Sequence, residues 1–414
     1  MKKNIYSLRI ALGVFVILIS QIAQSETVDW NVWLASQLQQ HPDVAAAHEQ
    51  WTGSNASADG LEQPLYNPEF SSELGRSGQD NNFTLGIQQT VDWWDRRSVG
   101  QDKAVFMRLA ADAYYRQQLL EKAAVALSAL VEWQTTERAA SIAEDQKKQL
   151  NTLLDLAVKR QKAGDIGSID AELAFLSLSQ QLAQAAEIEV ALQKAENSVR
   201  ELLPQWTANK GGIPEAFWPS EPADVSDNDL LSHPLVQNAH AQWQVSNEEA
   251  VAARLAVKAD PTFGVNAGRD GGDNLIGLTF SMPLNVRNNF SAEKRASNSA
   301  ALEHEARFQA VYRKQRFNWQ AAKTAWRRYQ EQYLLWQTTV QGRVNNSAEL
   351  LERQWQSGDL STTDYLQALN QRTDSLQAGI HLEKQTRLAL IEMLQQSGDL
   401  IPHLDLLAKL KPTN

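Results

Sequence analysis

Two pairs of short segments in the chain alternate between apolar and small polar residues. In FTLGIQQTV (83–91) and IGLTFSM (276–282) every second residue is apolar except Gln89, and the residues between are glycine, serine, threonine or glutamine. Each follows a weaker alternating segment, EFSSELGR or TFGVNAGR, across the turn sequences SGQDN and DGGDN. A period of two with one oily face is typical of β-strands. The pattern predicts two hairpins, with strands at about 68–76, 83–91, 261–269 and 275–283.

The rest of the chain has helical spacing of apolar and alanine positions. Two very long helices are expected, about 99–162 and 292–356, and at 1.5 Å per residue each would be roughly 96 Å long. Such a length exceeds ordinary globular helices and indicates coiled-coil-like packing. Each long helix ends at a Gly-Asp break. Shorter helices are expected at about 41–60, 168–203, 233–258 and 361–396.

These elements occur twice in the same order. HPDVAAAH (41–48) returns as HPLVQNAH (233–240), and NPEFSSELGRSGQDN (67–81) returns as DPTFGVNAGRDGGDN (260–274). AGDIGSID (163–170) returns as SGDLSTTD (357–364), so the offset stays between 192 and 194 residues. A period this long indicates a duplicated unit rather than a solenoid.

The repeat boundaries divide the mature chain. The first copy is predicted at 26–203 and the second at 233–397. Between them, 204–232 is rich in proline and glycine and is interpreted as a linker or an equatorial segment. A C-terminal tail, 398–414, follows.

The N-terminus, 1–25, has the pattern of a secretory signal peptide. Lys2, Lys3 and Arg9 precede or flank the apolar stretch 10–19, and Ala23-Gln24-Ser25 is a small-x-small cleavage site. An uncleaved anchor is the alternative, and the short apolar core disfavours it. No later stretch approaches 18 consecutive apolar residues.

The composition of the chain and its lack of catalytic motifs exclude several classes of function. The chain has no cysteine, which excludes disulfides and thiolate metal sites. Removing the three basic residues of the signal peptide from a net charge of −10 leaves −13, so nucleic acid is a poor partner. The sequence lacks the Gly-x-Ser-x-Gly, His-Glu-x-x-His, P-loop and Rossmann patterns. We therefore predict a protein that is not an enzyme and needs no cofactor.

The histidines suggest a metal site only superficially. His41 and His48, like His233 and His240, are seven residues apart, about 10 Å along a helix. One ion cannot be shared across that distance, and His-Pro is common at a helix start. We predict structural roles for these histidines and no metal site.

Strands with oily faces on an exported protein raise the question of membrane insertion. A sheet in lipid must close, because unpaired edge groups cost several kcal/mol each, and membrane barrels start at about eight strands. Four strands per chain would then require several chains, and three chains would give about 12 strands. A small soluble sheet packed on the helices is the alternative.

The ordered, duplicated pattern resembles the TolC-type outer membrane efflux proteins. The segments that carry the resemblance are HPLVQNAHAQ, DPTFGVNAGRDGGDNLIGLTFSMPL and RQWQSGDLSTTDYLQAL, and the second is most similar to the heavy-metal-cation, CzcC-like branch. The resemblance implies a mainly α fold with a membrane β-barrel: a homotrimer with a helical α-barrel and a 12-stranded outer membrane β-barrel. It also implies a periplasmic helical tunnel, a periplasmic adaptor (membrane fusion) protein and an inner-membrane RND-type pump as partners, beside outer membrane lipid.

The resemblance also assigns roles to residues at the Gly-Asp breaks. The implied adaptor-docking helix tips are Ala163, Gly164, Asp165, Ser357, Gly358 and Asp359. Asp364 matches an aspartate of the family's periplasmic pore constriction, with Asp170 as its counterpart in the first copy, whereas the second such aspartate aligns with Gln367. Helix capping is the alternative for both, because Ser361 and Asp364 have capping-box spacing and Gly358 fits a left-handed helix end.

The sequence DWWDRR (92–97) departs from the metal branch. Trp93 and Trp94 suit the aromatic girdle of a barrel at the membrane interface, and packing at a helix start is the alternative. The function expected from the whole pattern is a passive outer membrane exit duct of a tripartite efflux system, for heavy-metal cations. The alternatives are a duct for drugs or secreted protein, or a soluble periplasmic scaffold or adaptor without a pore.

Overall fold

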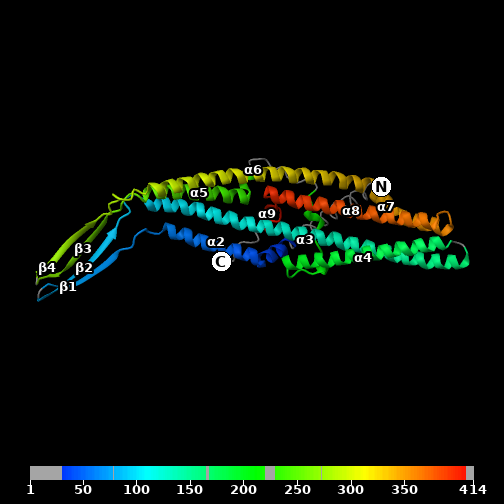
Figure 1. Cartoon of the computed structure of the whole chain (residues 1–414), viewed down its shortest axis with the longest axis horizontal. Coiled ribbons are helices and arrows are strands. Elements are labelled where there is room, and N and C mark those ends of the chain that lie inside the picture. The colour runs from blue at the N-terminus through cyan, green and yellow to red at the C-terminus, as the bar shows by residue number, and fades with distance from the viewer. Residues whose placement is uncertain (1–29, 78, 165–166, 220–228, 272, 407–414) are drawn as a thin grey trace, which may run out of the picture. The chain divides into compact units, whose positions relative to one another are not determined.

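The computed structural model describes residues 30–77, 79–164, 167–219, 229–271 and 273–406. The predicted signal peptide therefore lies outside the described residues, as do Asp165 and the end of the C-terminal tail. The described chain is mainly helical with one four-stranded antiparallel sheet, which confirms the predicted mixture of long helices and two hairpins (Figure 1).

The chain divides into two compact units, and each draws on both sequence copies. The helical unit contains Met1–Val44, Leu119–Ser226 and Arg316–Asn414. The sheet unit contains Ala45–Gln118 and Asp227–Gln315. The copies detected in the sequence are thus not the units that pack together.

The first copy contributes a helix, a hairpin, a very long helix and a returning helix. α2 spans Pro42–Glu62, β1 Glu69–Ser77, β2 Asp80–Thr90, α3 Arg96–Ala163 and α4 Ser168–Leu202. Short 3₁₀ turns follow at Ala208–Lys210, Glu215–Phe217 and Asp229–Ser232. α3 alone has 68 residues, about 100 Å of helix at 1.5 Å per residue.

The second copy repeats this order with one irregularity. α5 spans Pro234–Leu255, β3 Thr262–Asp270, β4 Asp273–Ser281, α6 Ser291–Trp336, α7 Gly342–Ser357, α8 Thr362–Ser397 and α9 Leu400–His403. The single long helix expected at 292–356 is interrupted by a π-helical turn, Gln337–Gln341, between α6 and α7. A π turn holds more residues than an α turn. It matches the increase of the repeat offset from 193 residues at the strands to 194 at the Gly-Asp break.

The histidines at the two His-Pro sequences cap helices. His41 Nδ1 accepts from the Asp43 amide, and His233 Nδ1 accepts from the Leu235 amide at the start of α5, both at 3.2 Å. The second histidine of each pair packs edge-on against an aromatic ring, His48 on Tyr115 and His240 on Phe308. These contacts are structural, as the sequence predicted.

The core of the helical unit includes the segment between the copies. Trp206 is buried, packs edge-on against Trp133 at 4.8 Å and donates its indole N–H to the Gly211 carbonyl at 3.0 Å. Phe217 is buried too and packs against His403 at 4.9 Å. Because these aromatic side chains are anchored in a core, 204–219 packs on the helices rather than spanning solvent.

Candidate functional site

The four strands form one open sheet in the order β1-β2-β3-β4. Directly paired residues of an antiparallel sheet lie on the same face. Phe70 pairs with Ile87, Ile87 with Val265 and Val265 with Leu278, so the register gathers the alternating apolar residues of all four strands. This apolar face consists of Phe70, Leu74, Phe83, Leu85, Ile87, Phe263, Val265, Ile276, Leu278 and Phe280.

The residues that the structure describes leave the apolar face uncovered. Its ten side chains are 44% to 86% exposed. Large apolar patches of this kind on a protein surface mark contact with a partner or a membrane.

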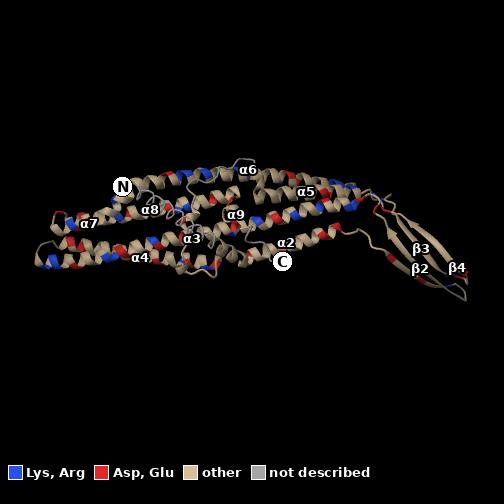
Figure 2. Cartoon of the chain, turned by 180° about the vertical axis from the view of Figure 1, so that it is seen from behind, with Lys and Arg blue, Asp and Glu red and all other residues tan. Residues whose placement is uncertain are grey.

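The opposite face of the sheet is made of small and polar residues. Ser71, Gly86, Asn266 and Gly277 form one row across the four strands. Thr84, Gln88, Gly264, Gly268 and Thr279 belong to the same face, with Leu275 as its apolar exception. β2 after Asp80, β3 before Arg269 and β4 after Asp273 carry no charge, whereas charged side chains are frequent on the helices (Figure 2). The sheet thus separates an oily face from a polar one.

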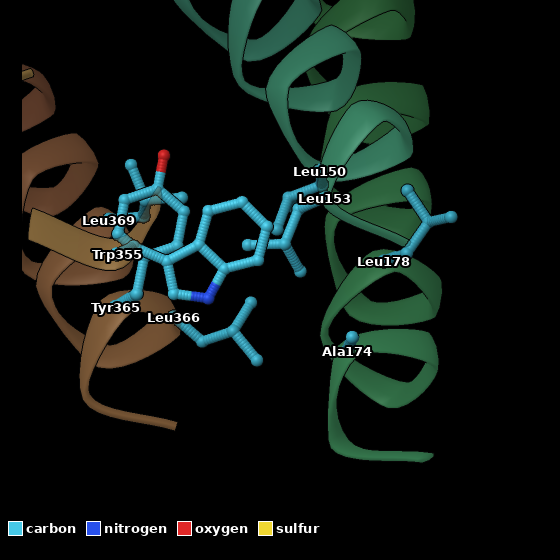
Figure 3. Packing of buried hydrophobic residues seen from close by; sticks show 8 residues of the cluster. All are labelled: Leu150, Leu153, Ala174, Leu178, Trp355, Tyr365, Leu366 and Leu369. Atoms are coloured by element: carbon cyan, nitrogen blue, oxygen red, sulfur yellow. The ribbon is translucent and has the colours of Figure 1, made fainter. Parts of the chain in front are cut away.

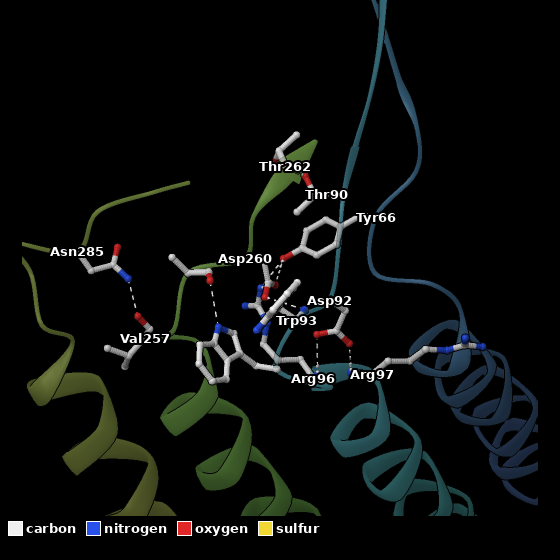
Figure 4. A network of polar contacts seen from close by, with 12 residues as sticks. Tyr66, Thr90, Asp92, Trp93, Arg96, Arg97, Val257, Asp260, Thr262 and Asn285 are labelled. Carbon is white, nitrogen blue, oxygen red and sulfur yellow. Dashed lines mark hydrogen bonds and ion pairs between the residues drawn. The ribbon is translucent and has the colours of Figure 1, made fainter. Parts of the chain in front are cut away.

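A buried carboxylate ties the strands to the helix that follows them (Figure 4). The Asp260 side chain is 2% exposed; its Oδ1 accepts from the Trp93 amide at 3.2 Å, and its Oδ2 from the Tyr66 hydroxyl at 2.8 Å. Arg96 forms an ion pair with Oδ2 and also donates to the Tyr66 hydroxyl. A buried charge needs such partners, because an unpaired one is costly.

The DWWDRR sequence forms the rest of this junction. The Asp92 carboxylate accepts from the backbone amides of Arg96 and Arg97, both at 2.8 Å, and so caps the start of α3. The Trp94 indole donates to the Ala259 carbonyl at 3.0 Å, with the Lys258 ammonium 4.4 Å from its ring centroid. Trp93 is 63% exposed and Trp94 is partly exposed, at the ends of the strands.

The second Gly-Asp break has the geometry that its sequence predicts. Gly358 has φ of +83°, the left-handed conformation that ends α7. Ser361 is the N-cap of α8: its Oγ accepts from the Asp364 amide at 3.1 Å and donates to the Asp364 carboxylate at 2.7 Å. The predicted cap is confirmed, and Asp364 remains exposed beside it.

The first break differs from the second. Gly164 has φ of +82°, but the N-cap of α4 is Gly167, which has no side chain to bond an amide. Asp170 accepts instead from the Thr363 hydroxyl at 3.2 Å, which links the first turn of α4 to the first turn of α8. Ala163, Gly164, Ser357, Gly358 and Asp359 are exposed at the two breaks.

Behind the breaks lies a small hydrophobic core that joins the two helical hairpins. It comprises Leu150, Leu153, Ala174, Leu178, Trp355, Tyr365, Leu366 and Leu369, and the Trp355 indole extends from α7 toward Leu150 and Leu153 of α3 (Figure 3). The Arg160 guanidinium carbon lies 4.9 Å from the Trp355 ring centroid, and Arg160 also donates to the Gln356 carbonyl at 3.2 Å. Burial raises the pKa of the Tyr365 hydroxyl. The two hairpins therefore hold each other at their tips.

The part of the chain that the structure describes contains no cluster of three or more histidine and carboxylate side chains suited to hold a metal ion. Over the same residues, none of the helices has an apolar stretch sufficient for a membrane span.

Residues 33–204 match the family described as "Outer membrane efflux protein". The match covers less than half of the chain. The match agrees with the family resemblance seen in the sequence over these residues, and it does not single out a heavy-metal branch. The matched family description and the solved structures below name efflux and channel proteins, in agreement with the prediction that the chain is not an enzyme.

Solved structures of outer membrane proteins share the fold over almost the whole chain. The CmeC outer membrane channel of Campylobacter jejuni has a TM-score of 0.73 at 13% identity, covering 90% of this chain and 86% of its own. CusC, described in connection with transmembrane channel formation, has a TM-score of 0.72 at 16% identity, covering 90% and 93%. VceC of Vibrio cholerae has a TM-score of 0.70 at 14% identity, covering 90% and 96%. Likeness at these identities establishes the fold. No curated protein sequence matches the chain.

The structure also reveals contacts that sequence reasoning missed. Arg96 with Asp260 and Arg160 with Trp355 join residues 164 and 195 positions apart. For the first contact a signal existed, because Asp260 begins the repeated DPTFGVNAGRDGGDN segment. For the second, the tryptophan in the break sequence RQWQSGD was a signal, because a large aromatic beside a helix end needs a partner.

Proposed function

We propose that the chain is the outer membrane exit duct of a tripartite efflux system. In this proposal three copies assemble, the sheets pool into a 12-stranded barrel in the outer membrane, and the helices form a periplasmic tunnel. An inner-membrane RND-type pump supplies the energy and a periplasmic adaptor connects pump and duct.

One observation carries the proposal, namely the two-faced sheet. Ten large apolar side chains are exposed on one face, and mostly small and polar residues occupy the other. In water such an apolar face is unfavourable, by about 25 cal/mol per Å² of exposed apolar surface, whereas lipid accepts it. Membrane barrels alternate in the same way, with apolar residues toward lipid and polar residues toward the lumen.

The edges of the sheet support assembly from several copies. β1 pairs only with β2 and β4 only with β3 in the described chain, which leaves one strand edge open at each side. Unpaired backbone groups in lipid cost several kcal/mol each, so the edges of neighbouring copies would pair with one another. With four strands of 9 to 11 residues per chain, three copies supply the strands of a barrel with an open lumen.

The helix breaks are the proposed docking and constriction sites. Ala163, Gly164, Ser357, Gly358 and Asp359 would contact the adaptor, together with Asp165, which lies outside the described residues. Asp364 and Asp170 would line the mouth of the tunnel, where carboxylates from three copies would favour cations over anions. Trp93 and Trp94 would lie at the membrane interface, where amphipathic rings are favoured.

Heavy-metal cations are the proposed substrate. The support is the similarity of DPTFGVNAGRDGGDNLIGLTFSMPL to the heavy-metal branch and the carboxylates at the proposed mouth. A deletion strain complemented with the gene should regain growth in zinc, cobalt, cadmium or copper salts, and not in drugs. Restored growth only in drugs would reject the metal assignment while keeping the duct.

Neighbouring positions on β4 offer a matched test of membrane insertion. Leu278 lies on the apolar face and Thr279 on the polar one. Leu278→Lys should reduce the amount of detergent-extractable, outer-membrane protein, because a lysine facing the bilayer midplane costs about 2–4 kcal/mol. Thr279→Lys should insert normally and alter the conductance measured in planar bilayers.

The opposite ordering of the two variants would contradict the proposed orientation of the sheet. Recovery of the wild-type protein in the soluble periplasmic fraction without detergent would reject the channel itself.

A further inference from the structure

The helical unit contains a pocket that the duct proposal does not use. It has a volume of about 500 Å³ and lies between α3, α6 and α8, beside the π-helical turn and the Glu215–Phe217 turn. One wall is apolar, with Ile142, Trp336 and Ile380, and the other is charged, with Arg138, Glu215, Glu383 and Arg387. Pockets of 300–1,000 Å³ that combine an apolar surface with a few polar groups are the usual sites for small molecules.

A buried ionic group forms the charged wall. The Glu383 side chain is only 7% exposed, and each of its oxygens pairs with one arginine: Oε2 with Arg138 at 2.7 Å and Oε1 with Arg387 at 2.8 Å. Arg387 also pairs with Glu215 at 2.6 Å, and its guanidinium carbon lies 4.9 Å from the Trp218 ring centroid. The charged groups of Glu383 and Arg387 are therefore occupied by contacts within the protein.

The guanidinium of Arg138 has fewer contacts within the described part of the chain. Its side chain is 45% exposed, and within the described part of the chain its guanidinium contacts Glu383 through Nη1. A guanidinium has five N–H donors in a fork that matches a carboxylate, so most of the Arg138 donors remain for another acceptor. The two arginines and two glutamates of the wall have no net charge. The wall can therefore bind a ligand through the unused hydrogen-bond donors of Arg138 rather than through a net positive charge.

The apolar wall is built at a structural cost. Gly379 lies in the interior of α8, where glycine is unfavourable compared with alanine. A Cβ on Gly379 would lie 2.3 Å from the Trp336 ring, so the glycine lets this indole rest directly on the backbone of α8. Trp336 immediately precedes the π-helical turn, and Gln341 at the end of that turn also lines the pocket. π turns within helices are frequent at functional sites.

We propose that this pocket binds a small aromatic carboxylate. The carboxylate accepts hydrogen bonds from Arg138, which Glu383 and Arg387 hold in position, and the ring lies against Trp336 and Ile380. The anion is favoured over a cation because both oxygens of Glu383 are already paired and Arg138 offers unused donors, whereas the second carboxylate oxygen of Glu215 belongs to a side chain that is 80% exposed to water. The inference concerns a side pocket of one chain and does not rest on the proposed duct.

The probe for this site is naphthalene-1-acetate, with naphthalene-1-acetamide as a ligand of the same shape without the charge. The full-length protein in a neutral detergent is titrated with each, and binding is measured by isothermal calorimetry and saturation-transfer NMR. We expect saturable binding of the acetate, with Kd of about 1 mM or tighter for a ligand of this size. The acetamide should bind at least tenfold more weakly.

Two variants separate recognition by Arg138 from general effects of lost charge. Arg138→Gln should weaken acetate binding at least tenfold, and Arg138→Lys should lie between it and the wild type, since a lysine keeps the charge without the fork. Arg200→Gln is the matched control, because Arg200 is similarly exposed, at 48%, and pairs with Glu196 of its own helix away from the pocket. It should leave the affinity unchanged.

Three results would overturn the proposal: no saturable binding of the acetate to the wild type, equal affinity for acetate and acetamide, or equal affinity of the Arg138→Gln and Arg200→Gln proteins. The first two use only the wild-type protein, so they hold even where a variant folds poorly.

Discussion

Trp355 and Tyr365 stack face to face, with ring centroids 5.1 Å apart and planes inclined by 7°. Trp355 lies in the last turn of α7 and Tyr365 in the first turn of α8, on either side of the break at Gly358, and both are buried. The stack therefore closes the α7–α8 hairpin, while the contact of Trp355 with Arg160 attaches that hairpin to α3.

Removing the indole should loosen both hairpins. Trp355→Ala deletes a buried aromatic from the core shown in Figure 3 and should destabilise the protein by about 3–5 kcal/mol. Thermal unfolding followed by circular dichroism measures the loss. Phe175→Ala on α4 is the control, because Phe175 is exposed and its removal should leave the melting temperature almost unchanged. Similar melting temperatures for the two variants would contradict this role of Trp355.

The start of α8 depends on its capping serine. Ser361→Ala removes the acceptor for the Asp364 amide and should destabilise the first turn of α8 by about 1 kcal/mol. Hydrogen exchange should show faster exchange for the amides at 362–365 and little change elsewhere. Ser375→Ala, in the interior of the same helix, removes a hydroxyl that donates to the Gln371 carbonyl and should leave these rates unchanged. Unaltered exchange after Ser361→Ala would show that tertiary packing, rather than the cap, holds this turn.

Asp364 has a cap contact and an exposed carboxylate, so one substitution separates its two proposed roles. Asp364→Asn keeps the amide that Ser361 accepts, and the protein should fold normally. If the carboxylate lines the tunnel mouth, the ratio of cation to anion permeability should fall by about twofold or more, because three charges are removed from one ring. Reversal potentials in asymmetric potassium chloride provide the measurement. Asp374→Asn, further along α8, is the matched control. Unchanged selectivity in the Asp364 variant would leave capping as its role.

The buried carboxylate at the base of the sheet should be sensitive to truncation. Asp260→Ala leaves Arg96, Tyr66 and the Trp93 amide without their acceptor and should cost about 3 kcal/mol. The corresponding residue of the first copy is Asn67, which is exposed, and Asn67→Ala should change stability by less than about 0.5 kcal/mol. Denaturant or thermal unfolding compares the two. Equal effects would mean that the Asp260 contacts contribute little to stability.

The comparison between copies explains which parts of the fold were visible in the sequence. Alternation in FTLGIQQTV and IGLTFSM indicates strands because side chains of a strand point to opposite faces in turn. Gly358 and Ser361 predict a helix end and a helix start because the left-handed conformation and the side-chain cap are local properties. These features depend only on residues that are a few positions apart in the sequence.

Other features depended on the fold. Asp92 was grouped with Trp93 and Trp94 in a sequence suited to a membrane interface, and the structure adds that its carboxylate caps α3. The only sign of the π-helical turn after Trp336 in the sequence is the one-residue change of the repeat offset, because a π turn has no distinctive composition.

The sequence by itself determined the duplication, the long helices with their breaks, the two hairpins and the oily face of each strand, since all of these follow from local periodicity and spacing. Only the tertiary structure decided which segments of the two copies pack together. It also decided that Asp260 contacts Arg96, that Trp355 contacts Arg160, and that Arg138, Glu383 and Arg387 line one pocket. Asp260 and Arg96, Trp355 and Arg160, and Arg138 and Glu383 are each more than 160 positions apart in the chain. Packing of whole helices and strands determines such neighbours, and the spacing of residues along one element carries no record of them.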